Sequence, residues 1–231
     1  IDGTLVDSRR IIHDAMLHAY DRCGLPDPGF DRIRKVIGLG LRQAFATLEP
    51  DAPEEALTEL ETAYVEAFVI FRETQEGREP LYEGALELLE QLHSEGWRLG
   101  IATGKSRRGV ANIFRMHALD RLFHASVCAD DGPGKPHPFM VQENLRLTGA
   151  DPARTIVIGD ATHDMAMAKA AGVRGLGVCW GFALADELRE AGAHEIHECY
   201  GSLTRGIGAL ELKASSWSVP RAKCTTGRSA S

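Results

Sequence analysis

Ile156-Val157-Ile158-Gly159-Asp160 is the stretch that decides the fold, because a short and wholly apolar run ends there in an acidic residue. Such a run indicates a β-strand that is covered on both faces, as in a parallel sheet with helices on each side. Similar segments lie at 98–102, 125–129 and 175–179, and stretches of helical periodicity separate them. Strands that alternate with helices at this spacing predict βαβ units, and therefore an α/β fold with a parallel sheet.

The residues from about 9 to 79 have a different pattern. Ile11, Ile12 and Met16 recur at helical spacing, and a longer apolar stripe runs from Leu57 to Phe68. We therefore predict an all-helical insertion at 9–79, after the first strand of an α/β core made of 1–8 and 80–210. The last residues, 211–231, are rich in Ser, Thr, Lys and Arg without amphipathic periodicity, which predicts a disordered tail.

Composition excludes several classes of partner. The net charge of -7 gives no basic surface, so we expect neither nucleic acid nor an anionic membrane as a partner. No apolar run reaches the roughly 18 residues of a transmembrane helix. The five cysteines are scattered and form no Cys-x-x-Cys pair, which is typical of reduced thiols. We expect a cytoplasmic protein.

Several polar residues follow predicted strands, at the edge where parallel sheets bind their ligands. Asp160 and Asp164 can face one point, and such carboxylates suit Mg²⁺, although a loop acid and a helix-start carboxylate give the same pattern. Thr103 and Gly104 follow a strand and are predicted to open a helix, whose free N–H groups can hold a phosphate or be capped in the ordinary way. Lys135 lies in a stiff Gly/Pro loop, where its charge can neutralise carboxylates and a transferring phosphoryl group.

Four segments, in the order in which they occur along the chain, resemble the motifs of the haloacid dehalogenase superfamily. They are Asp2-Gly3-Thr4, Ile101-Ala102-Thr103-Gly104, Gly134-Lys135-Pro136, and Ile158-Gly159-Asp160 with Asp164. The chain looks closest to phosphoglycolate-phosphatase-like members with a helical cap inserted after the first motif. That resemblance implies a Rossmann-like core and Mg²⁺-dependent hydrolysis of a small phosphorylated metabolite, a phosphate monoester, through an aspartyl-phosphate.

The resemblance also assigns roles to individual residues. Asp2 is expected to act as general acid and base and to offer its backbone carbonyl to the metal. Thr103, Gly104 and Lys135 are expected to bind phosphate, with Thr103 and Lys135 also serving catalysis. Asp160 and Asp164 are expected to hold Mg²⁺.

One departure concerns the nucleophile. The family motif is Asp-x-Asp-Gly-Thr, and Ile1 stands at the x, so the attacking aspartate would precede Ile1. We therefore expect residues 1–231 alone to be inactive. A rival alignment makes Asp2 the nucleophile and Thr4 the second position, as in ion-pumping ATPases, but Gly3 to Ser8 fits the phosphatase alignment far better.

Two further hypotheses stay open: a protein that binds a phosphorylated ligand without turnover, and a phosphomutase of the same superfamily. The sequence of the helical insertion does not identify the substrate. Arg34, Lys35 and Arg42 can meet an anionic substrate or be solvated helix charges. His163, between the two metal-binding candidates, is expected to face solvent.

Overall fold

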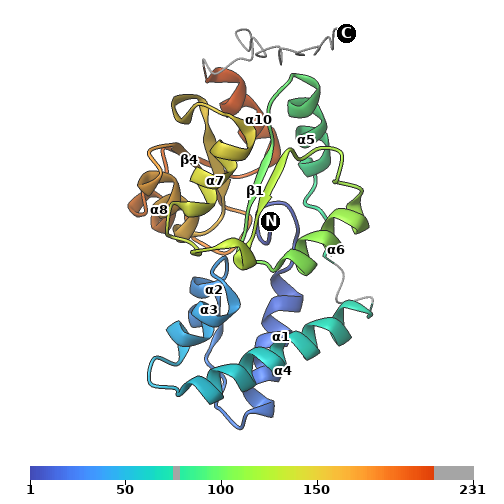
Figure 1. The fold of residues 1–231 in the computed structure, drawn as a ribbon, viewed down its shortest axis with the longest axis vertical. Coiled ribbons are helices and arrows are strands. Elements are labelled where there is room, and N and C mark those ends of the chain that lie inside the picture. The colour runs from blue at the N-terminus through green and yellow to red at the C-terminus, as the bar shows by residue number, and fades with distance from the viewer. Residues whose placement is uncertain (75–78, 211–231) are drawn as a thin grey trace, which may run out of the picture.

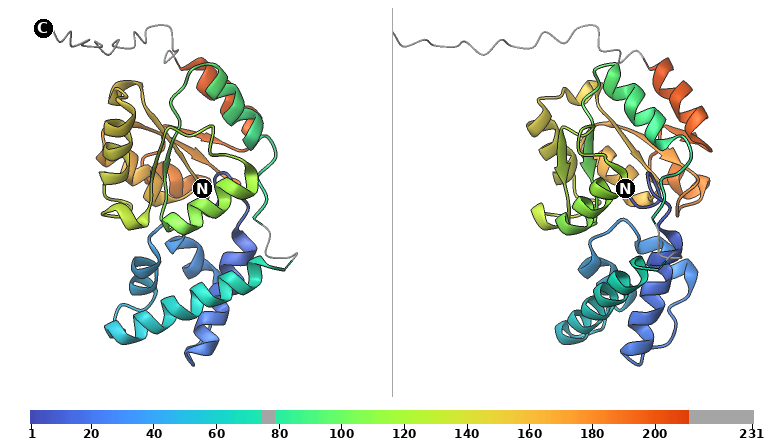
Figure 2. Two further views of the ribbon diagram at one scale, coloured as in Figure 1. Left: turned by 45° about the vertical axis from the view of Figure 1, so that its right-hand side comes forward. Right: turned by 90° about the vertical axis from the view of Figure 1, so that its right-hand side faces the viewer.

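The computed structural model describes residues 1–74 and 79–210, and it has an α/β core with a helical body at one end (Figure 1). Two further views show the same separation (Figure 2). The predicted α/β class with parallel strands is confirmed. The strands are β1 (Gly100–Ala102), β2 (Ala125–Val127), β3 (Ile156–Gly159), β4 (Arg174–Val178) and β5 (Glu195–His197). The predicted tail at 211–231 lies outside the described residues.

The core helices pack around these strands. They are α5 (Ala85–Ser94), α6 (Arg107–His117), α7 (Phe139–Thr148), α8 (Thr162–Ala170), α9 (Ala185–Glu190) and α10 (Tyr200–Ala209). Their buried faces are apolar, as the periodicity of the sequence predicts for helices that cover a sheet. β5, α9 and α10 were not among the predicted elements, and β5 has a weak pattern because Ile196 is its single apolar residue.

All strand pairings are parallel, and they form two sheets. β1 pairs with β2, with Gly100 opposite Ala125, and the second sheet has the order β3-β4-β5. β1 and β3 both line a cavity of about 230 Å³, which Ile1 also lines. Thr4 hydrogen-bonds Asp160, and Ile1 and Asp2 line one cavity with Thr103, so the carboxyl ends of β1 and β3 lie near the start of the chain.

The second strand is shorter than predicted. We expected it to reach residue 129, but β2 ends at Val127 and residues 129–131 form a single 3₁₀ turn. The backbone N–H of Cys128 donates a hydrogen bond of 2.8 Å to Asp131 Oδ2. The Asp131 side chain thus accepts the hydrogen bond that the Cys128 N–H would donate to the neighbouring strand if β2 were longer, and the strand pairing ends there.

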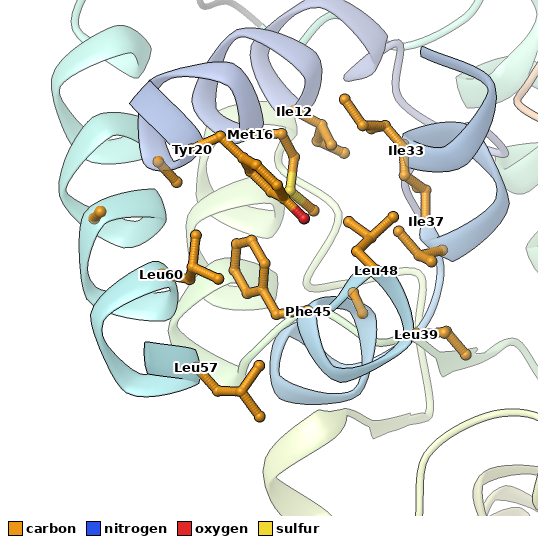
Figure 3. Close-up of a cluster of buried hydrophobic side chains, with 14 of the residues drawn as sticks. Ile12, Met16, Tyr20, Ile33, Ile37, Leu39, Phe45, Leu48, Leu57 and Leu60 are labelled. Carbon is orange, nitrogen blue, oxygen red and sulfur yellow. The ribbon is translucent and has the colours of Figure 1, made fainter. Parts of the chain in front are cut away.

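Four helices form the cap, a name used from here for α1 (Arg9–Arg22), α2 (Phe30–Val36), α3 (Leu41–Leu48) and α4 (Glu54–Arg72). Figure 3 shows their apolar side chains meeting in one cluster, with Tyr20, Phe45 and Leu60 at its centre. Each such fully buried side chain contributes roughly 1.5–3 kcal/mol. Phe182, from the loop after β4, completes the cluster from the core side.

The cap is seated on the core through specific contacts. Arg34 of α2 donates to both carboxylate oxygens of Glu187 on α9, at 2.7 and 3.0 Å. His163 Nε2 lies 2.9 Å from the backbone carbonyl of Lys35, so this ring contacts the cap and does not simply face solvent as expected. Within the described residues, no helix has the length and apolar character needed to cross a membrane.

Candidate active site

The first residues form a tight loop that places their side chains against β3. The backbone carbonyl of Ile1 accepts hydrogen bonds from the N–H groups of Thr4, Leu5 and Val6 at 2.8–3.2 Å. Gly3 turns this loop with a φ of +72°, and a Cβ there would lie 2.0 Å from Asp160 Oδ2. Only glycine fits both the backbone conformation and the close approach.

Asp160, at the end of β3, is held by two donors. The hydroxyl of Thr4 donates to Oδ1 at 2.7 Å, and the backbone N–H of Phe182 donates to Oδ2 at 3.1 Å. Burial, and then repulsion from Asp164, raise the pKa of Asp160 to about 6. A buried carboxylate pair of this kind is stabilised by a cation placed between its members.

Asp164, in the first turn of α8, is paired with Lys135. Lys135 Nζ lies 2.5 Å from Asp164 Oδ1 although its side chain is only 5% exposed. The backbone N–H of Ala161 donates to the other oxygen, Asp164 Oδ2, at 3.1 Å. The Gly/Pro loop therefore delivers a buried ammonium group directly to one of the carboxylates that we expected to hold the metal.

Asp2 has a cation of its own, Lys105. Lys105 Nζ lies 2.8 Å from Asp2 Oδ1 and 3.0 Å from Glu79 Oε1. The Glu79 side chain is 0% exposed, and Arg72 at the end of α4 contacts it at 2.9 Å. Burial acts to raise the pKa of Asp2, but the charge of Lys105, the ammonium group of Ile1 and the side-chain donors of Lys105 and Ser8 together outweigh burial, so that this pKa is lowered.

Thr103 and Gly104 lie at the end of β1, as predicted, but they do not open the helix. α6 begins at Arg107, and its N-cap is Ser106, whose hydroxyl accepts from the N–H of Gly109 at 3.3 Å. That earlier interpretation of the helix start was wrong, because Ser106 is the stronger capping residue. Thr103 is buried, and its hydroxyl oxygen accepts from the backbone N–H of Lys105 at 3.2 Å.

The predicted site residues come together around one space. A cavity of about 560 Å³ lies between cap and core, and its walls include all of the residues proposed from the sequence: Asp2, Thr103, Gly104, Lys135, Asp160 and Asp164. They come from four separated segments of the chain. The structure thus brings them together at the carboxyl ends of β1 and β3, and their chemical roles stay predictions.

The donor set fits a hard divalent cation. Each oxygen of Asp160 and Asp164 accepts one hydrogen bond, which leaves lone pairs for a metal. The backbone carbonyl of Asp2 accepts no hydrogen bond from the described residues. Oxygen ligands from one or two carboxylates, completed by water, are typical of Mg²⁺. No group of three or more His, Cys, Asp or Glu residues close enough to share a metal occurs in 1–74 and 79–210.

Sequence reasoning missed the Lys105–Glu79–Arg72 chain of charges. Lys105 directly follows the phosphate-binding candidates, which was the one available signal. Two of the cap cations have ion-pair partners: Arg34 binds Glu187 of the core, and Arg42 binds Glu54 and Glu61 within the cap. Arg34 does not line the cavity, whereas Arg42 does and is held there by the two carboxylates.

Comparison with known proteins agrees with this geometry. The profile of haloacid dehalogenase-like hydrolases matches residues 1–178. The chain is 34% identical to the probable phosphatase IndB of Dickeya dadantii, over 94% of each chain. It is 28% identical to a phosphoglycolate phosphatase of Agrobacterium fabrum, over 79% of each chain.

A solved structure shares the arrangement of elements. The crystal structure of a hydrolase from Pseudomonas syringae superposes with a TM-score of 0.80 at 28% identity, and the match covers 90% of this chain and 95% of the other. Motifs, fold and relatives therefore agree, and this chain belongs to the haloacid dehalogenase-like hydrolase family.

Proposed function

We propose that this protein is a Mg²⁺-dependent phosphatase that hydrolyses a small phosphate monoester through an aspartyl-phosphate. The observation that supports this proposal is that Asp2, Thr103, Lys135, Asp160 and Asp164 all line the same cavity. Phosphoryl transfer depends on positioning and on neutralising charge, and this cavity offers groups for both.

The nucleophile in this proposal is an aspartate one position before Ile1. One of its carboxylate oxygens attacks phosphorus, the bond from phosphorus to the substrate oxygen breaks, and the leaving oxygen needs a proton. Asp2 supplies that proton and then, as a carboxylate, takes one from the water that hydrolyses the acyl phosphate. General acid–base catalysis of this kind contributes roughly 10²–10⁴ in rate.

Lys105 sets the resting state of Asp2. The ammonium group of Lys105 is the largest of the influences that lower the pKa of Asp2, which suits the base step. A bound phosphate brings negative charge close to Asp2, and nearby negative charge raises a carboxyl pKa, which suits the acid step. The same residue can then serve both steps.

The remaining polar groups hold the anion. Lys135 balances the charge of Asp164, and the hydroxyl of Thr103 can donate to a phosphate oxygen. Asp160, Asp164 and the carbonyl of Asp2 would hold Mg²⁺, which when bound offsets repulsion between the anionic substrate and the carboxylates.

The test compares three chains in the hydrolysis of a generic aryl phosphate with Mg²⁺: residues 1–231, the same chain preceded by Asp, and the same chain preceded by Asn. We expect turnover only with the added Asp. Turnover by residues 1–231 or by the Asn form would contradict the assignment of the nucleophile. Inactivity of all three, with phosphate still bound, would favour the ligand-binding alternative. Transfer of phosphate to a sugar phosphate instead of water, followed by ³¹P NMR, would favour a phosphomutase.

A further inference from the structure

The cavity between cap and core is larger than a short phosphate ester requires. Its volume is about 560 Å³. If each non-hydrogen atom takes roughly 30 Å³, the volume of one water molecule in the liquid, a molecule of the size of phosphoglycolate fills only about half of that space. The cap is already seated on the core here, because a Cβ on Gly104 would lie 2.2 Å from the backbone carbonyl oxygen of Leu39.

One wall of the cavity is largely apolar: two of its side chains are exposed valines, and the other two are aromatic rings that pack on the cap cluster. It consists of Tyr64, Val65, Phe68 and Val69 on α4. Val65 is 47% exposed and Val69 is 38% exposed, and the two lie one helical turn apart. These four residues are called the α4 wall below. The ring centroid of Phe68 lies 5.2 Å from Lys105 Nζ, so the α4 wall borders the polar groups, and an apolar body attached to a phosphate can pack on Val65 and Val69.

The charges of the cavity leave little for a second anionic group. The lining includes five basic side chains, and four of them already contact carboxylates: Arg42, Arg72, Lys105 and Lys135. Arg108 alone among these basic side chains has no ion pair with a described residue, and it lies exposed on α6. The carboxylate of phosphoglycolate would therefore be desolvated without a buried cation to compensate it.

Tyr64 adds a neutral polar group beside the reacting end. Its side chain lines the cavity, and no described residue hydrogen-bonds its hydroxyl. Burial, followed by the nearby charges of Asp2 and Glu79, raises the pKa of Tyr64 well above its usual value. The hydroxyl therefore stays protonated, and it can serve an uncharged hydroxyl or ether oxygen of a ligand.

Resting on the proposed function, we propose that the substrate is the phosphate monoester of an uncharged alcohol with an apolar body of about ring size, which packs on the α4 wall. A short substrate with a second anionic group fits this cavity less well, in size and in charge.

Binding to residues 1–231 with Mg²⁺ tests this without relying on turnover. The probes are 2-phenylethylphosphonate, ethylphosphonate and phosphonoacetate, which share the phosphonate and differ in the group attached to it. We expect 2-phenylethylphosphonate to bind at least about tenfold more tightly than ethylphosphonate by calorimetry, since burial of a phenyl ring has about that effect. Phosphonoacetate is expected to bind no better than ethylphosphonate.

A double variant, Val65→Ser with Val69→Ser, locates the effect. It should remove most of the preference for the phenyl probe and leave ethylphosphonate binding in place. Ile70→Ser is the matched control, because Ile70 is 61% exposed on the same helix and does not line the cavity. Equal loss in both variants would overturn the role of the wall.

The outcomes separate the two proposals. Tighter binding of phosphonoacetate than of the phenyl probe overturns the substrate class but leaves the phosphatase proposal intact. Equal binding of the phenyl and ethyl probes does the same. Failure of all three to bind overturns the substrate class and also contradicts the phosphate-binding site on which it rests.

Discussion

Arg34 and Glu187 join the cap to the core through two hydrogen bonds, of 2.7 and 3.0 Å, between residues 153 positions apart in the chain. The guanidinium side chain is 12% exposed and the carboxylate 27%. A two-pronged pair with this degree of burial fixes orientation as well as distance.

This pair predicts a specific effect of acid. The hydrogen bonds from Arg34 lower the pKa of Glu187 from 4.5 to about 2. Because the folded-state pKa is depressed, the stabilisation is fully present above about pH 4.5 and is lost as the pH falls toward 2. Glu187→Gln should lower Tm by roughly 2–4 °C at pH 7, a loss of about 1 kcal/mol, and the difference from the parent should vanish near pH 2. Thermal unfolding across this range measures it, with the exposed Glu190→Gln on α9 as control. A difference that persists unchanged at pH 2 would contradict the assignment.

Lys105 is predicted to position Asp2 for proton transfer. In the chain preceded by Asp, Lys105→Met should lower kcat by about 10-fold or more with a smaller change in KM. The substitution removes the ammonium group that contacts Asp2 and the buried Glu79. Lys105→Arg should restore part of the loss. Steady-state kinetics with an aryl phosphate distinguish the variants, and the exposed Lys169→Met serves as control. An unchanged kcat in Lys105→Met would remove the residue from the mechanism.

Magnesium is predicted to stabilise residues 1–231 through Asp160. At about ten times its dissociation constant, a ligand that binds only the folded state adds about 1.4 kcal/mol, which raises Tm by a few degrees. Asp160→Asn should abolish this increment, whereas the exposed Asp120→Asn should keep it. Differential scanning fluorimetry with and without MgCl₂ measures both. The metal assignment fails if Asp160→Asn responds to Mg²⁺ as the parent does.

Gly104 is predicted to be intolerant of any side chain. Gly104→Ala places a Cβ within 2.6 Å of the carbonyl oxygens of both Leu39 and Gly38, so the cap loop has to shift. Such overpacking costs about 1–3 kcal/mol. Gly208→Ala is the matched control, because a Cβ there meets nothing within 4 Å and lies in α10. Helix propensity should make that variant slightly more stable. Urea unfolding compares the two, and equal stability of both variants would refute the close contact.

The sequence predicted the structural elements that depend mainly on a short stretch of residues. A wholly apolar run such as Ile156–Ile158 needs a covered strand whatever surrounds it, and an acid directly after it must lie at the sheet edge. The positions of Asp160 and Asp164 followed from this. The short strand β5 was missed because its local pattern is weak and its pairing with β4 stabilises it.

Ion pairs between distant segments were beyond such reasoning. Lys105 and Glu79 are 26 positions apart, and Arg34 and Glu187 are 153 positions apart. Each of these residues, taken by itself, has the pattern of an ordinary surface charge. The tertiary structure, which brings Arg34 of α2 to Glu187 of α9 and brings Arg72 of α4 and Lys105 to Glu79, determines which charges become buried together.

Phe182 has a consequence for any attempt to exchange caps between relatives. Its ring packs in the cap cluster from the core side, and its backbone N–H donates a hydrogen bond to Asp160 Oδ2. If helices α1–α4 were transferred to another core, a cavity would form in the cluster at the position of Phe182 unless the loop after β4 were transferred as well. Conversely, a substitution that moves Phe182 to suit a different cap would also disturb Asp160, a carboxylate of the core, so the cap and the core cannot be exchanged independently.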